Sequence, residues 1–364
     1  MQNTDLYEII LAAILISSFS SIGIAFAQSP PVNSSSTASP TSPTAAITTE
    51  TAPSQLQSSN STQPRTITHA MGETIIAGTL QRVVVFSNND YIEDVLALGV
   101  QPVGVAEPAK MWEQLVDLPF SLSTNVTDIG TDDEPNLEAV ARLEPDLIIG
   151  RLDLHGRIYE DLNRIAPTVL FQHISPEGGP SRLEVQERNF MGIADALNRH
   201  DKGVEILESR QARYQELASQ LQAAGLNGSK YILAETFFDQ PEEMRVYESN
   251  FPTGEVLEII GLENAAVPPV GTPFNQWGES NLGLEGIAAL DDPDVHFFHG
   301  ARHGERGGDV LGTYYNNHPV WQNLEFVKAG HVYNIGNIWM TGGVYTTMAV
   351  AERVVDALTG QQTS

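Results

Sequence analysis

Arg151 is a residue whose place in the sequence points to chemistry. It follows the apolar run Leu147-Ile148-Ile149-Gly150, which is typical of a strand buried on both faces in a parallel sheet. Pro145 ends the helix expected before that run. Open α/β sheets bind their ligands at the carboxyl ends of such strands. A charged side chain at this position therefore predicts part of a binding site.

Three histidines, His296, His299 and His303, resemble a metal-binding cluster. However, His296 lies within the expected strand Val295–Phe298 and His299 follows it. This odd spacing directs the two imidazoles to opposite faces. We therefore predict no direct metal site. The chain also has no cysteine, which excludes disulfides, thiolate metal ligands, cysteine nucleophiles and a lipoprotein signal cysteine.

Local catalytic motifs are missing from the sequence. We find no Gly-x-Ser-x-Gly turn, no Gly-x-x-x-x-Gly-Lys phosphate loop and no Gly-x-Gly-x-x-Gly turn after a strand. The acidic pairs Asp132-Asp133 and Asp291-Asp292 are expected in solvated loops and helix caps. We predict a protein that is not an enzyme and needs no cofactor. A secreted α/β hydrolase or a glycosidase is the alternative from another class.

The segment around Arg151 occurs twice. Its pattern is Leu-Glu-x-(Val/Ile)-Ala-x-Leu followed by Pro-Asp-(Leu/Val), and the second copy runs from Leu284 to Val295 with one extra residue before the proline. Each copy is preceded by a strand and by a helix that ends in glycine, at Gly99 and at Gly261. The repeated order of strands and helices predicts two similar Rossmann-like α/β lobes with mostly parallel sheets.

A long helical stretch separates the two copies. It extends from Arg182 to Leu221, with a break expected at Asn198-Arg199-His200. We predict an N-terminal lobe over 67–200, a connecting helix over 201–225 and a C-terminal lobe over 226–362. One helix spanning both lobes joins them stiffly. The alternative is a long surface helix that belongs to one lobe.

The N-terminal region has the composition of an export signal followed by a tether. Residues 1–27 contain an apolar run that ends in Ala25-Phe26-Ala27, which is typical of a cleaved secretory signal. Asp5 and Glu8 precede the run without any Lys or Arg, so an uncleaved membrane anchor is the alternative. Residues 28–66 are rich in Ser, Thr, Pro and Ala and are expected to form a flexible tether.

The charge balance limits the partners. The 364 residues contain 19 basic and 46 acidic side chains, which gives a formal net charge of −27. Nucleic-acid binding needs a basic face, so this composition argues against a nucleic-acid partner. The acidic surface mainly implies solubility. We expect a monomer.

Ordered motifs after the tether resemble one family, the substrate-binding proteins of ferric-siderophore and vitamin B12 ABC importers with a rigid inter-lobe helix. The matching fragments are His69-Ala70-Met71-Gly72-Glu73-Thr74, Arg82-Val83-Val84-Val85, Leu98-Gly99-Val100-Gln101-Pro102-Val103-Gly104-Val105, Asn136-Leu137-Glu138, Pro145-Asp146-Leu147-Ile148-Ile149-Gly150, Ile165-Ala166-Pro167-Thr168-Val169, Arg245-Val246-Tyr247, Trp321-Gln322-Asn323-Leu324, Val327-Lys328-Ala329-Gly330-His331-Val332-Tyr333 and Trp339-Met340-Thr341-Gly342-Gly343. The iron-siderophore branch is the most similar. The resemblance implies a periplasmic protein that captures a ferric siderophore and delivers it to an inner-membrane permease dimer; cobalamin or haem is the alternative ligand.

The resemblance also implies a role for the two repeated glutamates. In related proteins the glutamate of each Leu-Glu helix docks on arginines of the two permease subunits, and the matching positions here are Glu138 and Glu285. Two acids at equivalent places on two lobes suit a symmetric partner. The alternative is that each is a first-turn glutamate favoured by the helix dipole.

A ferric chelate has an oxygen-rich surface with apolar edges, so Arg, Tyr, His and Trp side chains suit it. The candidates at strand ends and in the loops after them are Tyr91, Trp112, Arg151, His155, Arg245, Tyr247, Trp277, Arg302, Arg306 and Trp339. Arg245 and Trp339 lie on motifs that match the family. Many siderophore binders carry Arg-His where this chain has Leu154-His155, and Arg151 is the residue that can compensate.

Overall fold

The computed structural model describes residues 63–86, 90–108, 118–175, 178–237, 240–267, 272–302, 311–336, 340 and 342–360, with the side chains of 301 and 302 excepted. They all belong to one compact unit, Ser58–Ser364. The expected signal, 1–27, and the tether up to residue 62 lie outside the described residues. Strand β1 (Arg65–His69) begins within the expected tether, one residue before its end at residue 66, and pairs antiparallel with β2 (Gly72–Ile76).

The first sheet is entirely parallel, with the order β5-β4-β3-β6-β7. Its strands are β3 (Val83–Val85), β4 (Gly104–Val105), β5 (Thr127–Asp128), β6 (Leu147–Arg151) and β7 (Thr168–Phe171). All residues of β3 and β6 are buried, as the apolar runs predicted. The chain leaves β3 for β4 on one side and later returns to β6 on the other side. The carboxyl ends of β3 and β6 therefore form a topological switch point.

Five short helical segments belong to the first sheet. They are α2 (Asp90–Ala97), α4 (Leu137–Arg142), α5 (Leu152–His155), the 3-10 turn η1 (Gly156–Ile158) and α6 (Tyr159–Ile165). The Asn136 side chain accepts from the Ala139 N–H and caps α4. Helix α2 ends before Gly99, whose φ of 79° is the left-handed conformation that glycine adopts easily.

The second sheet is mixed. Strand β8 (Lys230–Phe237) pairs in parallel with β12 (Val295–Arg302) and β10 (Glu263–Asn264), and β13 (Val332–Asn334) continues the parallel part beyond β12. On the other side of β8, strand β9 (Glu243–Tyr247) pairs antiparallel with β8, and β11 (Glu279–Gly283) pairs antiparallel with β9. Strand β8 thus has neighbours on both sides that come later in the chain, and a second switch point lies where β8 and β12 end.

The helices of the second lobe are α9 (Pro252–Ile259), α10 (Leu284–Ala288), α11 (Pro319–Asn323), α12 (Glu325–Lys328) and α13 (Val344–Thr359), with a π-turn, η2, over Leu311–Tyr315. Helix α9 ends before Gly261, whose φ is 103°. The order of strand, glycine-terminated helix, Leu-Glu helix and Pro-Asp strand therefore occurs in both lobes. The prediction of two α/β lobes is confirmed.

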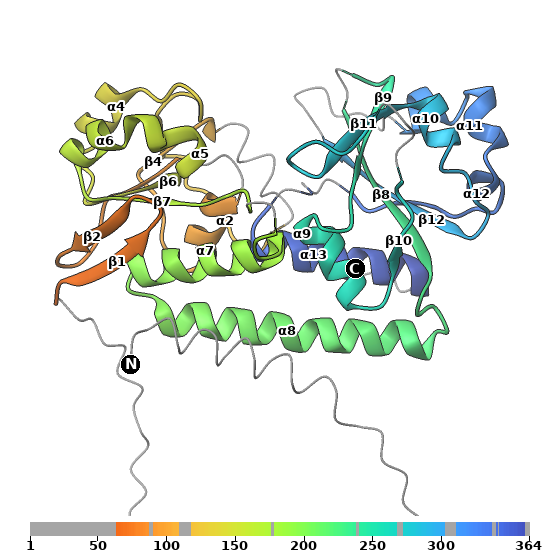
Figure 1. Cartoon of the computed structure of the whole chain (residues 1–364), viewed down its shortest axis with the longest axis horizontal. Helices are drawn as coiled ribbons and strands as arrows, with labels where there is room; N and C mark the ends of the chain where they lie inside the picture. Colours follow the sequence, from red (N-terminus) through yellow and green to blue (C-terminus); the bar gives the residue numbers. More distant parts are fainter. Residues whose placement is uncertain are drawn as a thin grey trace, which may run out of the picture. The chain divides into compact units, whose positions relative to one another are not determined.

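One long helix, α8 (His200–Ala223), connects the two lobes and follows directly on α7 (Arg182–Ala196), the last helix of the first lobe. The two helices meet at the predicted break, where Asn198 has a φ of 57°. Helix α8 packs on α7 at one end and on α9 and α13 at the other, and Figure 1 shows it running along both lobes. Its Tyr214, Leu217 and Leu221 are buried in the core of the second lobe. Among the described residues, no helix is long and apolar enough to cross a bilayer.

Candidate binding site at the ends of the two sheets

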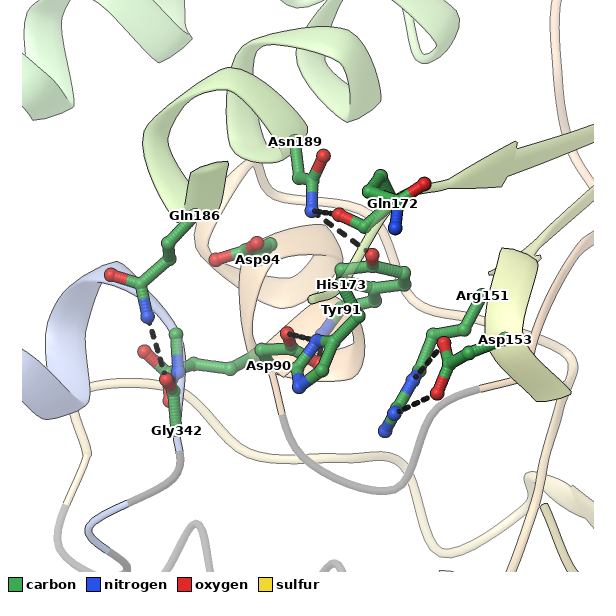
Figure 2. A network of polar contacts seen from close by, with 12 residues as sticks. Asp90, Tyr91, Asp94, Arg151, Asp153, Gln172, His173, Gln186, Asn189 and Gly342 are labelled. Atoms are coloured by element: carbon green, nitrogen blue, oxygen red, sulfur yellow. Dashed lines mark hydrogen bonds and ion pairs between the residues drawn. The ribbon is translucent and has the colours of Figure 1, made fainter. Parts of the chain in front are cut away.

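Arg151 is the last residue of β6, at the switch point of the first sheet. The residue is 9% exposed, and its guanidinium donates to both carboxylate oxygens of Asp153, from Nε at 3.2 Å and from Nη2 at 2.6 Å (Figure 2). Burial lowers the pKa of Arg151, but the hydrogen bond to Asp153 and the charges of Asp90 and Asp153 outweigh it and raise that pKa. The Arg151 guanidinium is therefore charged, and its two hydrogen bonds to Asp153 fix its orientation.

Trp277, a residue of the second lobe, lies beside the Arg151 guanidinium. The Arg151 guanidinium carbon lies 5.3 Å from the centre of the Trp277 ring, and the ring of His173 lies 5.8 Å from it. The first of these contacts has the geometry of a cation–π pair. Arg182 donates to the Gln276 carbonyl at 2.9 Å and helps to fix the Trp277 loop. Two sequence candidates from different lobes, Arg151 and Trp277, are thus in contact.

His173 and Asp90 extend this cluster, which we call the Arg151 cluster: Asp90, Arg151, Asp153, His173 and Trp277. The Nδ1 atom of His173 lies 3.1 Å from Asp90 Oδ2. Sequence reasoning missed Asp90, Asp153 and His173. The rule that selected Arg151 also selects His173, because His173 follows the carboxyl end of β7 by two residues.

Tyr91 lies beneath the Arg151 cluster and is 1% exposed. Its hydroxyl accepts from Asn189 Nδ2 at 3.1 Å, and the same amide donates to the Gln172 carbonyl at 2.7 Å (Figure 2). Burial, with the charge of Asp90, raises the pKa of Tyr91 well above its ordinary value. This neutral phenol connects α2 to α7 and supports the cluster from inside the lobe.

His155 is fully buried behind Arg151. Its Nδ1 accepts from the Arg151 backbone N–H at 3.0 Å, so its Nε2 carries the proton that it donates to the Asp132 carbonyl at 2.9 Å. Burial lowers the pKa of His155, which keeps the ring neutral. Both ring nitrogens are used within the lobe, so His155 fixes the backbone of the Arg151 turn.

Arg245 and Tyr247 lie next to the switch point of the second sheet. The Arg245 guanidinium is 4.7 Å from the Phe237 ring centre, and its Nη1 is 3.4 Å from Glu279 Oε1. Tyr247 is fully buried and donates to Glu235 Oε2 at 2.7 Å. Burial lowers the pKa of Arg245, but Tyr247, Glu279 and Glu235 outweigh it and raise that pKa. Arg245 is the half-buried group that can reach a ligand, and Tyr247 supports it.

The structure does not describe the side chains of the remaining ligand candidates. Trp112, Arg306 and Trp339 lie outside the described residues, and Arg302 ends β12 with its side chain also outside them. His303 is outside as well. The ring of His296 lies against that of His331, tilted, with 4.5 Å between ring centres, whereas His299 is 2% exposed. Within the described ranges, no three His, Asp or Glu side chains are grouped closely enough to hold a metal ion.

Glu138 and Glu285 occupy equivalent helical positions. Each is the second residue of its helix, α4 or α10, and each is exposed. The Glu138 side chain is 89% exposed and lies 3.8 Å from Arg142, a pair that exposure makes weak. In Figure 1, α4 and α10 lie on the side of the two lobes away from α8. Both carboxylates are accessible to a partner.

Two α/β lobes connected by one long helix, with cationic and aromatic side chains where the sheets end, define the class III periplasmic binding fold. The chain belongs to the periplasmic binding protein family, whose sequence profile matches residues 84–338. Members of this family are substrate-binding proteins, which confirms the resemblance found in the sequence.

Individual relatives agree with this assignment. The chain is 29% identical to the Fe(3+)-citrate-binding protein YfmC of Bacillus subtilis (strain 168) over 276 residues, 76% of this chain and 79% of the relative. It is 28% identical to the iron(3+)-hydroxamate-binding protein FhuD of Escherichia coli (strain K12), over 74% of this chain and 84% of the relative. The crystal structure of the siderophore-binding protein FhuD from Vibrio cholerae, bound to Fe3+-Desferal, superposes with a TM-score of 0.66 and 27% identity, over 78% of this chain and all of that one.

Proposed function

We propose that this chain is an extracytoplasmic binding protein that captures a ferric siderophore where the two sheets end and delivers it to an ABC importer. The observation that carries the proposal is the contact between Arg151 of the first lobe and Trp277 of the second. Together these side chains offer a fixed hydrogen-bonding cation and a flat apolar surface. An oxygen-rich chelate with apolar edges needs both.

The iron is cargo and arrives wrapped in its chelator. Arg151 and Arg245 would donate to chelate oxygens, and Trp277 would cover an apolar edge. Asp153 and Glu279 hold these arginines in place before the ligand arrives, which reduces the entropy lost on binding. Trp112, Arg302, Arg306 and Trp339 complete the proposed ligand set, and Tyr91, His155 and Tyr247 support it. The chelate leaves unchanged, since we infer binding without catalysis.

The proposed partner is a permease dimer in the inner membrane, which a monomer of this protein would meet through Glu138 and Glu285. Their exposure at matching helical positions supports this role. We propose a periplasmic location, with residues 1–27 acting as a cleaved signal or as an anchor. The relatives bind iron(3+) citrate or iron(3+) hydroxamate, which supports an iron chelate over cobalamin or haem.

Tryptophan fluorescence tests the proposal. Titration with iron-loaded hydroxamate, catecholate and citrate chelates is expected to give saturable quenching with one of them. The Trp277→Phe variant should lose much of that quenching and bind about tenfold more weakly, because the smaller ring makes a weaker cation–π contact and offers less flat area. Trp321→Phe is the matched control.

Trp321 is 1% exposed in the core of the second lobe. Its replacement should lower the melting temperature and leave quenching and affinity unchanged. Quenching that survives in Trp277→Phe but disappears in Trp321→Phe would contradict the site. No saturation by any of the three chelates would contradict the function.

A further inference from the structure

Helices α2 and α9 occupy equivalent places in the two lobes. Along the chain, α2 comes between β3 and its parallel neighbour β4, and α9 comes between β8 and its parallel neighbour β10. Strands β3 and β8 are the first strands of their sheets. Each has a glutamate at its fourth position, Glu93 in α2 and Glu255 in α9. Both carboxylates leave their own lobe and bind the start of a helix in the other one.

Glu93 caps α13, the last helix of the second lobe. Its Oε2 accepts from the Gly343 N–H at 2.8 Å and the Thr346 hydroxyl at 2.6 Å. Its Oε1 accepts from the N–H groups of Tyr345 at 2.8 Å and Thr346 at 2.9 Å. The first turn of a helix has N–H groups without internal partners, and Gly343 has no side chain to satisfy them. The 1% exposed Glu93 carboxylate does so from the first lobe.

Glu255 adds to the cap of α7, the helix that closes the first lobe, where Ser181 and Glu184 already form a capping box within that lobe. Its Oε1 accepts from the N–H groups of Arg182 at 2.9 Å and Leu183 at 3.3 Å. Arg182 also reaches the second lobe through Glu248, at 3.3 Å, and through the Gln276 carbonyl. The start of α7 is therefore held from across the boundary between the lobes.

Two glycines leave space for the Glu93 carboxylate at the start of α13. A Cβ on Gly342 would lie 2.6 Å from Glu93 Oε2, and a Cβ on Gly343 would lie 3.0 Å from Glu93 Oε1 and 2.5 Å from Asp94 Oδ1. A side chain at Gly342 would therefore collide with Glu93 and with the Thr346 side chain that Glu93 binds, and one at Gly343 would collide with Asp94 and crowd Glu93. Gln186 of α7 adds a further bond between the lobes by donating to the Gly342 carbonyl at 2.9 Å (Figure 2).

We propose that Glu93 and Glu255 are reciprocal positioning residues, each of which caps a helix of the opposite lobe and so fixes the relative position of the two lobes. Charge-assisted bonds to the positive ends of two helices resist both rotation and separation. The Arg151–Trp277 distance is then set before any ligand binds. The proposal concerns the free protein and does not depend on which ligand the site takes.

Distance measurement on the free protein tests this. Because the chain has no cysteine, Glu160→Cys on α6 and Ala289→Cys beside α10, both exposed positions, allow spin labels at two known places. Double electron–electron resonance should give one narrow distance distribution for the parent. Glu93→Ala and Glu255→Ala should each broaden it and add a second population at another distance. Glu93→Gln, which keeps the size but loses acceptor capacity, should do so to a smaller extent.

Asp291→Ala is the matched control. Asp291 accepts from the N–H groups of Glu325 and Phe326 and so caps α12 from a distant part of the chain, but within one lobe. It should lower the melting temperature without changing the distance distribution. If Glu93→Ala fails to fold, Glu93→Gln and Glu255→Ala carry the test. An unchanged distribution in the folded glutamate variants, even with a lower melting temperature, would overturn the proposal.

Discussion

Two neighbouring carboxylates on α2 differ sharply in how their charge is satisfied. Glu93 accepts four hydrogen bonds at the start of α13, whereas Asp94 accepts one, from the Val344 N–H at 3.4 Å. The Oδ2 atom of Asp94 is buried and has no hydrogen-bond partner among the described residues. Burial, followed by the charges of Glu93 and Asp90, raises the pKa of Asp94 well above its ordinary value. An ionised Asp94 is therefore costly to the folded state.

Asp94→Asn is expected to stabilise the protein in a pH-dependent manner. A carboxyl whose pKa is higher in the folded state than in the unfolded state lowers stability as it ionises. The loss begins as the pH rises above the unfolded-state pKa, about 3.9, and continues up to the folded-state pKa. The gain over the parent should therefore be small near pH 4 and grow to about 1–3 kcal/mol at pH 8. Denaturant unfolding at several pH values measures it. A gain independent of pH would show that the Asp94 charge is not the cause.

Arg151 and Trp277 were predicted from the sequence for different reasons. Arg151 follows from the rule that parallel strands present ligands at their carboxyl ends, and the structure has it there. Trp277 was selected by residue type alone. Its contact with Arg151 depends on how the two lobes meet, and a local sequence pattern carries no information about that. The internal roles of His155 and Tyr247 were also hidden, because burial is a tertiary property.

At the scale of elements, strands and helices with strong local signals were predicted well. The break between α7 and α8 follows from Asn198, which tolerates a left-handed backbone, and glycines end α2 and α9. The antiparallel strands β9 and β11 were missed as strands. They form one side of the second sheet, with β11 at its edge, and in both strands buried residues alternate with half-buried or exposed ones, so that no continuous apolar run marks them.

Helix α7 contains a glycine that its packing requires. A Cβ on Gly192 would lie 2.5 Å from Phe171 Cε1, a buried aromatic ring that cannot easily move aside. Gly192→Ala should destabilise the protein by about 1–3 kcal/mol through overpacking, although alanine is the better helix former. Chemical denaturation with Gln215→Ala, an exposed position of α8, as the control provides the measurement. A stabilised Gly192→Ala protein would mean that the α7–β7 contact is loose.

At the scale of the whole molecule, two exposed acids are proposed to meet one symmetric partner. The double variant Glu138→Lys/Glu285→Lys should abolish chelate uptake by cells while leaving the Kd for the chelate unchanged, because neither carboxylate contacts the Arg151 cluster. Glu160→Lys, an exposed reversal on α6, is the control and should transport normally. A loss of chelate affinity in the double variant would count against a docking role.

The central claim, capture of a ferric chelate, is tested most directly by native mass spectrometry of the purified chain in a competition mixture. The mixture contains iron-loaded hydroxamate, catecholate and citrate chelates together with cobalamin and haem. The expected result is one dominant complex of one chain with one ferric chelate, which is lost when iron is withheld. A complex with cobalamin or haem alone, or the bare chain under all these conditions, would contradict the claim.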